Sequence, residues 1–258
     1  MAATGALTSP WTSKMNPVLV VRVAIIATLL VLWQLMSMSG LLYEDVVPGL
    51  PQIAGGLYSL LTTAEFYGNL RVTAGEIISA SVIGGLGGLA AGLLLGGSHF
   101  IERAFERYFY YLGPTPKIIF FPLMIMWFGV GPGSKVAMGA MSCFFPVALA
   151  VAAGMRRIPP ILIRVGQSFR ANRWQMLTKV HLPAMREPVV NGLRLGFGVA
   201  LIGVLLAETK LSNQGLGFLV IQNYQRFDMP AMYALLITIF VLAVAVNAAL
   251  GRLSGARR

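Results

Sequence analysis

Charged side chains are scarce in this sequence. Only 11% of its 258 residues are Asp, Glu, Lys or Arg, whereas 57% are hydrophobic and the mean hydropathy is +0.75. A soluble domain usually carries about 25% charged residues. Because so few charges cannot cover a surface that faces water, the composition argues against an ordinary soluble domain and predicts a protein of the membrane.

Cysteine, histidine and nucleotide-binding motifs are also rare or missing. Cys143 is the single cysteine and lies in an apolar run, so an internal disulfide is excluded and packing is its expected role. His99 and His181 have no cysteine or carboxylate companions at the spacing of metal ligands, and we expect no metal site. No G-x-x-x-x-G-K-[ST] motif and no set of catalytic side chains occurs. The chain is therefore not expected to be an enzyme or to bind ATP itself.

Long runs without a charge are what the sequence has instead. Five of them, each of roughly 17 to 22 residues, are long enough for a helix that crosses a bilayer. They cover residues 23–43, 77–98, 118–134, 136–155 and 231–251, and a sixth apolar stretch, about 188–208, includes Arg194 and Glu208. Lipid offers the backbone no hydrogen-bond partners, and the runs are too long for barrel strands, so each span is expected to be a helix. The prediction is an all-α integral membrane protein with about six transmembrane helices.

The remaining segments connect these spans. Residues 1–17 are expected to form a flexible tail, 18–251 the transmembrane domain and 252–258 a second tail. The first apolar run has the basic flank of a signal peptide, but it is too long and lacks an A-x-A-like site, so a retained helix is favoured. Residues 44–68 are expected to be an outer loop that contains a short interfacial helix, and residues 99–114 an inner loop.

The basic residues predict how the spans are oriented. With six spans, 14 of the 20 Lys and Arg residues fall on one side, whereas Glu44, Asp45 and Glu65 fall on the other. Because cytoplasmic loops carry an excess of positive charge, the basic side is expected to be cytoplasmic, with both termini on it. The same distribution accounts for the net charge of +11, so nucleic-acid binding is not expected.

Glycines recur every four residues in the second apolar run. They share one face of the expected helix and are Gly84, Gly88, Gly92 and Gly96. Such a face lets another helix approach backbone to backbone, so helix packing is the expected role. The match to G-x-G-x-x-A at residues 85–90 lies inside an apolar helix with no preceding strand, and it is not interpreted as a dinucleotide site.

The segment 156–187 is the one long, polar and basic excursion between spans. Ile161, Val165 and Phe169 fall on one helical face, and residues 174–180 suit a second short helix. A helix pair with apolar residues and basic flanks suits docking in a groove of a partner. It also suits an amphipathic helix that lies on anionic lipid, and the residues alone leave both interpretations open.

The second half of this segment resembles the cytoplasmic loop of ATP-binding cassette importer permeases. That loop has the pattern E-A-A-x-x-x-G followed by L-P, and the match is carried by residues 171–175 and 182–183. Residues 164–166 then align with E-A-A, so that Arg164 replaces the acidic residue and Arg170 replaces the glycine. The resemblance implies an ATPase-coupling role for Arg164, Val165, Gln167, Phe169, Arg170, Ala171, Arg173, Leu182 and Pro183.

The resemblance extends over nearly the whole chain. Residues 116–135 are similar to the P-K-I…P-L…W-F-G-x-G…S-K stretch of the nitrate, taurine and aliphatic-sulfonate permease family. Residues 192–195, Glu208 and residues 214–217 are also similar to that family. The family implies a type I importer permease fold over residues 18–251, in the bacterial inner (plasma) membrane. It also implies a second permease chain, in a homo- or heterodimer, two ATPase subunits that bind ATP and magnesium, and an extracytoplasmic solute-binding protein. The implied solute is small, with nitrate-like or sulfonate-like anions as the suggested class.

Three residues are candidates for lining a translocation path: Lys117, Trp127 and Glu208. An ionisable residue inside a span is a functional candidate. The alternative for Glu208 is that its carboxylate reaches the interface or pairs with Lys210 or Arg71. Lys117 and Lys135 bracket the run 118–134, and both are expected to extend their ammonium groups toward the membrane surface.

Two other classes of membrane protein remain as alternatives. An ATP-independent secondary transporter or channel is disfavoured because no inverted repeat or intramembrane charge relay is visible. A membrane-embedded enzyme is disfavoured because the spans are nearly bare of polar clusters.

Overall fold

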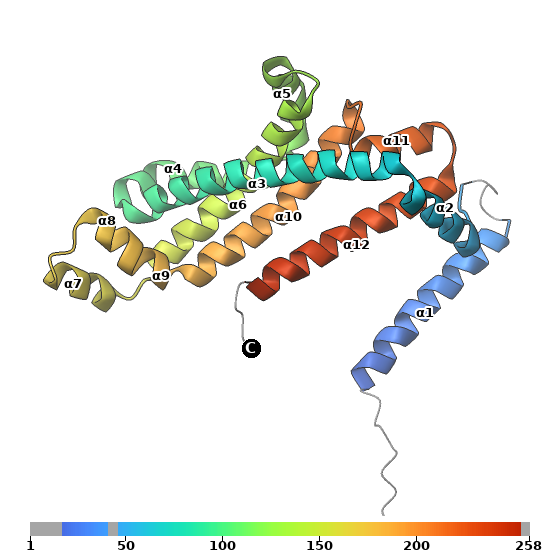
Figure 1. Cartoon of the computed structure of the whole chain (residues 1–258). Coiled ribbons are helices and arrows are strands. Elements are labelled where there is room, and N and C mark those ends of the chain that lie inside the picture. The colour runs from blue at the N-terminus through green and yellow to red at the C-terminus, as the bar shows by residue number, and fades with distance from the viewer. Residues whose placement is uncertain (1–16, 41–45, 254–258) are drawn as a thin grey trace, which may run out of the picture.

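The computed structural model describes residues 17–40 and 46–253, and the regular elements of this part are all helices (Figure 1). The longest are α1 (Pro17–Met38), α3 (Ala64–Gly97), α6 (Pro132–Arg156), α10 (Arg186–Lys210) and α12 (Met229–Leu253). Shorter helices connect them: α2 (Leu50–Thr62), α4 (His99–Leu112), η1 (Lys117–Phe120), α5 (Phe121–Phe128), α7 (Pro160–Ser168), α8 (Arg173–Gln175), η2 (Met176–His181), α9 (Leu182–Ala184) and α11 (Leu216–Gln225). Of the predicted tails and the first outer loop, residues 1–16, Glu44, Asp45 and residues 254–258 lie outside the described part.

Five helices of the described part are long and apolar enough to cross a membrane. They are Val18–Met38, Ala64–Gly97, Pro132–Arg156, Arg186–Lys210 and Met229–Arg252. The prediction of an all-α membrane protein is thereby confirmed. The stretch 188–208 forms one continuous helix, α10, although it contains both Arg194 and Glu208.

The apolar run 118–134 does not form the continuous helix that was expected. Its first part is the 3₁₀ turn η1 and the eight-residue helix α5, which ends where Gly129 takes φ 75°. Pro132 then stands in the first turn of α6, where its missing N–H leaves no intrahelical bond unmade. These two residues interrupt the run, so a short apolar helix, Lys117–Phe128, replaces the expected long span.

The segment 99–114 is mostly a helix, which corrects the expectation of a loop. Helix α4 begins after Ser98, whose Oγ accepts a hydrogen bond from the Ile101 N–H over 3.5 Å. Its acidic residues face α6, where Arg156 pairs with Glu102 at 3.2 Å and with Glu106 at 2.6 Å. The helix was missed because its charges interrupt the apolar run on which the span prediction depended.

Helices α3, α6 and α10 form the centre of the molecule (Figure 1). The glycine face of α3 lies against α6 and comprises Gly84, Gly88, Gly92 and Gly96. A Cβ atom at Gly88 would stand 2.6 Å from the carbonyl oxygen of Phe144, and one at Gly92 would stand 2.5 Å from that of Ala148. Both distances are too short for any side chain, so glycine is what allows the two helix backbones to approach so closely.

The other elements surround this centre at two ends. Helices α4, α7, α8 and α9 gather at one end, whereas α2 and α11 lie at the other, and α12 runs back from them (Figure 1). Helix α1 meets the bundle at its C-terminal end, beside α2, and its N-terminal end points away from the other helices (Figure 1). At the end near the bundle, the Trp33 ring meets that of Tyr233 edge-on at 5.4 Å. The basic segment between α6 and α10 therefore lies at the same end of the bundle as α4, and α11 lies at the opposite end.

Candidate functional sites

The polar segment between α6 and α10 folds into two helical arms. The first arm is α7, and it ends in a Schellman motif. The N–H of Ala171 donates to the carbonyl of Gly166 over 3.0 Å, and the N–H of Arg170 donates to that of Gln167 over 2.9 Å. Arg170 takes φ 52°, a conformation in which a side chain costs about 1–2 kcal/mol. The glycine that the related loop pattern has at this position is explained by that conformation.

The second arm begins at a capping box and contains a wide turn. The N–H of Gln175 donates to Asn172 Oδ1 over 2.8 Å, and the N–H of Asn172 donates to Gln175 Oε1 over 2.9 Å. The next turn, η2, is a π-helix, which is a rare form that recurs at functional sites. The matched residues 171–175 are therefore the ones that set where the second arm starts.

The two arms touch where Gly166 packs. A Cβ atom at Gly166 would lie 2.5 Å from Met176 Sδ and 3.3 Å from Val180 Cγ2. The atom met first is the far end of the flexible Met176 side chain, so an alanine, which the E-A-A pattern has at this position, needs only a shift of that side chain. The contact fixes the distance between the arms and therefore the width of the space that opens beside it.

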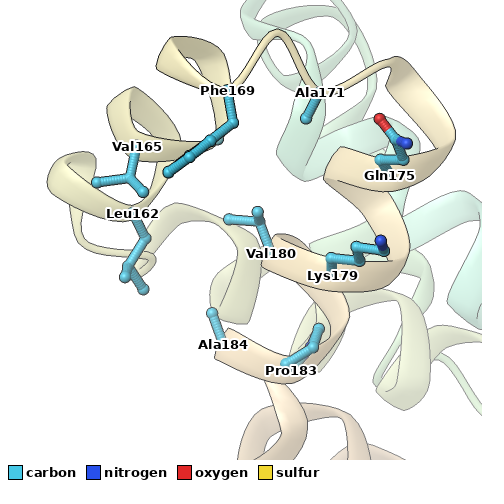
Figure 2. A pocket seen from close by; sticks show the side chains of 10 residues that line it. Leu162, Val165, Phe169, Ala171, Gln175, Lys179, Val180, Pro183 and Ala184 are labelled. Atoms are coloured by element: carbon cyan, nitrogen blue, oxygen red, sulfur yellow. The ribbon is translucent and has the colours of Figure 1, made fainter.

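That space is an open groove of about 720 Å³ between the arms (Figure 2). Figure 2 shows Leu162 and Val165 on α7, Phe169 directly after it, and Val180 and Ala184 on the other arm around one hollow. Phe169 is 83% exposed. The full lining is Leu162, Val165, Gly166, Phe169, Ala171, Gln175, Lys179, Val180, Pro183 and Ala184. A hollow lined by exposed apolar side chains on the polar end of a protein is typical of an interaction site.

The structure divides the predicted coupling residues into two sets. Four of them line the groove: Val165, Phe169, Ala171 and Pro183. Four others are exposed on the arms outside its lining: Arg164, Gln167, Arg170 and Arg173. Leu182 points inward and packs against the core cluster that contains Met185. Sequence reasoning did not select Leu162, Lys179 and Ala184 for the lining, although Leu162 stands one helical turn before Val165 on the same face of α7.

His181 lies at the end of η2 with its Nδ1 atom buried and without a hydrogen-bond partner in the described part of the chain. Burial lowers its pKa below the ordinary value near 6.5. The unfolded chain therefore binds this proton at a higher pH than the folded one does, and stability falls as the pH drops through about 6.5. We expect His181→Gln to lose less thermal stability than the wild type between about pH 7.5 and pH 5.5. The measurement is the unfolding temperature across this pH range, and identical curves for the wild type and His181→Gln would contradict the prediction.

A second set of polar residues is buried between α3, α6 and α10. Glu208 is 1% exposed, Lys135 1% and Glu76 5%. Glu208 Oε1 accepts a hydrogen bond from the Thr73 hydroxyl over 2.7 Å, and its Oε2 accepts one from the Gly217 N–H over 2.7 Å. Both carboxylates attract the Lys135 ammonium, while Glu76 Oε2 has no hydrogen-bond donor among the described residues. We call Glu76, Lys135 and Glu208 the charge cluster.

The charge cluster decides between the two interpretations of Glu208. Glu208 is buried and does not pair with Lys210 or Arg71. Its partners are Thr73, Gly217, Glu76 and Lys135. Lys135 is buried as well. Its Nζ donates to the carbonyls of Val130 and Gly131, in the turn that precedes α6.

The turn after α10 is shaped to reach Glu208. Gly215 takes φ 109°, and a Cβ atom there would collide with the Glu208 carboxylate. At Gly217 a Cβ atom would lie 2.7 Å from the Cβ of Glu208. The two glycines of the 214–217 motif therefore let the backbone close over the carboxylate.

The other two candidates for a translocation path lie elsewhere. Trp127 is 69% exposed on α5. Lys117 Nζ donates to the carbonyls of Gly113 and Thr115, the latter over 3.2 Å, and lies 5.3 Å from the centre of the Phe145 ring. The partners of Lys117 are thus different from those of Glu208, and the structure does not gather the three candidates into one cluster.

Long apolar helices with a polar, grooved segment at one end define the chain as an integral membrane protein with an exposed apolar groove. Residues 83–258 match the family of the binding-protein-dependent transport system inner membrane component, and the chain belongs to this family. It is 31% identical to a probable ABC transporter permease protein of Haemophilus influenzae over 85% of this chain and 89% of that protein. It is 29% identical to the taurine transport system permease protein TauC of Escherichia coli over 81% of this chain and 78% of that protein.

The fold is also found among solved structures. The chain superposes on a chain from the inward-facing MetNI methionine ABC transporter with a TM-score of 0.65 and 20% identity, over 73% of this chain and 94% of that one. The permease fold predicted from the sequence is therefore confirmed, and the chain is a permease subunit of an ATP-driven importer. Subunits of this kind are transport components and not enzymes themselves.

Proposed function

We propose that the groove between α7 and the second arm receives an ATPase subunit and transmits its movement to the spans. The observation that carries this proposal is the exposed apolar lining of the groove, with Phe169 at its edge. The segment 156–186 has no Asp or Glu, while Arg164, Arg170, Arg173 and Lys179 are exposed on it. An apolar groove inside a basic surface fits a partner surface with an apolar anchor and acidic surroundings.

The transmission follows from how the arms are joined to the bundle. Leu182 and Met185 belong to the core that also holds Val147 of α6, and α10 begins directly afterwards at Arg186. A force applied to the groove is therefore delivered to α6 and α10 through a packed core, which moves as a unit because packed cores deform little. The spans would rock between states open to either side of the membrane.

The rest of the assembly follows from the family. The chain would work beside a second permease chain, two ATPase subunits that bind ATP and magnesium, and an extracytoplasmic solute-binding protein. The basic end with α4 and α7–α9 would face the cytoplasm of a bacterium, with both termini on that side of the inner membrane. The TauC relative transports taurine, which supports a small sulfonate-like or other anionic solute for this chain. Measuring the ligand of the solute-binding protein that co-purifies with the chain tests the substrate class.

Phe169→Asp is the substitution that tests the docking proposal. A carboxylate in the apolar lining must be desolvated when a partner docks, at a cost of several kcal/mol, so we expect binding of the ATPase subunit to be lost almost completely. The measurement is the amount of ATPase chain that co-purifies with the tagged full-length permease from its native membrane, together with solute uptake.

The matched control is Phe100→Asp. Phe100 is an aromatic residue of similar exposure on α4, and it is outside the groove. It should leave ATPase recovery unchanged. Equal recovery with both variants, at normal amounts of permease in the membrane, would show that the partner docks somewhere else.

A further inference from the structure

A second groove lies between α3, α10 and α12, and its lining shares no residue with the first groove or with the charge cluster. It has a volume of about 520 Å³, and its walls include Ile78, Val82, Leu86, Leu193, Phe197 and Leu250. An adjoining cavity of about 200 Å³ shares Ile78 and Phe197 with it and has an apolar lining apart from Thr73. We call the first of these the lipid groove.

The length of the lipid groove matches one leaflet of a bilayer. Along α3 it extends from Ile78 to Leu89, which at 1.5 Å per residue is about 16 Å. The hydrocarbon core of a bilayer is about 30 Å thick, so half of it is about 15 Å. A continuous apolar wall of this length suits an acyl chain.

Arg194 is the one charged residue in the lining of the lipid groove. Its Nε donates to Asn247 Oδ1 over 2.7 Å, and a Cβ atom at Gly251 would lie 3.1 Å from its Nη1, so the guanidinium lies against α12. No ion pair joins Arg194 to a carboxylate in residues 17–40 and 46–253. The groove thus ends at a positive charge that the described protein does not neutralise there.

The depth of Arg194 is set by its contacts with α12. Asn247 and Gly251 stand six and two residues before Leu253, where α12 ends, which places them within about 3–9 Å of that end. Helix α12 has 25 residues, or about 37 Å, and is longer than the hydrocarbon core. Its end therefore reaches the headgroup region, where lipid phosphates lie.

We propose that the lipid groove binds one anionic phospholipid of the cytoplasmic leaflet. The guanidinium of Arg194, held by Asn247, receives the phosphate, and an acyl chain lies along Val82 and Leu86 of α3. A guanidinium presents a fork of donors that matches a phosphate, and basic pockets between helices on the cytoplasmic side are suited to anionic headgroups. The bound lipid would fill the space between α12 and the central helices, and so fix where α12 sits.

The test uses the full-length protein purified in detergent, with phosphatidylglycerol and phosphatidylcholine as probes. Native mass spectrometry measures how much of each lipid stays bound. We expect phosphatidylglycerol to be retained in preference, and Arg194→Gln to weaken its retention at least about tenfold, since a hydrogen bond to a charged group is lost. Arg226→Gln is the control, because Arg226 is an exposed arginine after α11, outside the groove, and this variant should behave as the wild type.

A second variant tests the groove while Arg194 stays intact. Leu86 is an exposed residue of its wall, so Leu86→Trp should keep the fold while it occupies the space of the acyl chain. Loss of phosphatidylglycerol from Leu86→Trp and from Arg194→Gln supports the proposal. Unchanged retention in Arg194→Gln overturns it, as does equal retention of both lipids by the wild type. A shift from dimer to monomer in Arg194→Gln, without loss of lipid, would also overturn it and assign the groove to a contact between two copies of the chain.

Discussion

Replacing Gly92 with leucine is expected to abolish the folded permease. A single Cβ atom there would already lie 2.5 Å from the carbonyl oxygen of Ala148 and 2.6 Å from the Cβ of Val151. Neither atom can move aside without moving α6, because both belong to the backbone or to the base of a side chain. Overpacking of a core usually costs about 1–3 kcal/mol, and a leucine pressed against backbone should reach or exceed the upper end of that range.

The measurement is the thermal unfolding temperature of the detergent-purified protein, together with the fraction that elutes as one sharp peak in size exclusion. Gly75→Leu is the matched control, since Gly75 lies on the same helix and is exposed, and a Cβ atom added there would meet no neighbouring side chain or other helix within 4 Å. It should fold normally. A Gly92→Leu protein as stable as Gly75→Leu would mean that α3 and α6 do not pack through the glycine face.

The contrast between these two glycines shows what the sequence reveals about the helix packing. The spacing of Gly84, Gly88, Gly92 and Gly96 is a local pattern, so the packing face of α3 was visible without a structure. The partner helix was not visible, because nothing in the sequence near α6 marks it as the surface that the glycines meet. The long helices were predicted for a similar reason, since lipid forces every backbone group in an apolar run into a helix.

The failures have a common physical origin in contacts between distant residues. Thr73 and Glu208 are 135 positions apart and meet at 2.7 Å, and no local pattern announces that distance. Helix α4 was missed although Glu102 and Glu106 stand four residues apart on one face, a spacing that predicts a helix when its partner, Arg156, is known. In the docking segment the matched residues predicted where the arms bend, whereas the groove itself depends on how Gly166 packs on Met176.

The charge cluster leads to the second prediction, for the variant Lys135→Met. The substitution keeps the length of the side chain and removes the charge that both carboxylates attract. The negative charge of the buried carboxylate pair would then remain without this counter-charge. Removing one partner from a buried ion pair usually destabilises a protein by about 3–5 kcal/mol, and we expect an effect of that size in thermal unfolding.

A second substitution, at one of the two carboxylates, shows whether Lys135→Met loses stability through charge or through a poor fit of methionine. It should restore stability only if the loss comes from charge. Glu208 keeps two hydrogen bonds, from Thr73 and Gly217, whereas Glu76 Oε2 has no donor in the described part of the chain, so Glu76 is the better residue to neutralise. Lys135→Met with Glu76→Gln should therefore recover more than half of the lost stability. A double variant no more stable than Lys135→Met alone would assign the loss to packing and not to charge.

Lys210→Met is the matched control for Lys135→Met, because Lys210 is exposed at the end of α10. Its effect should be within about 0.5 kcal/mol, as is usual for surface substitutions. The comparison separates burial from charge, because the same chemical change is made in both places. If Lys135→Met were as mild as Lys210→Met, the cluster would not hold α3, α6 and α10 together. A large effect confined to Lys135→Met would show that the three central helices are held together by this buried cation where α6 begins. Further along α6, the glycine face of α3 has the same role.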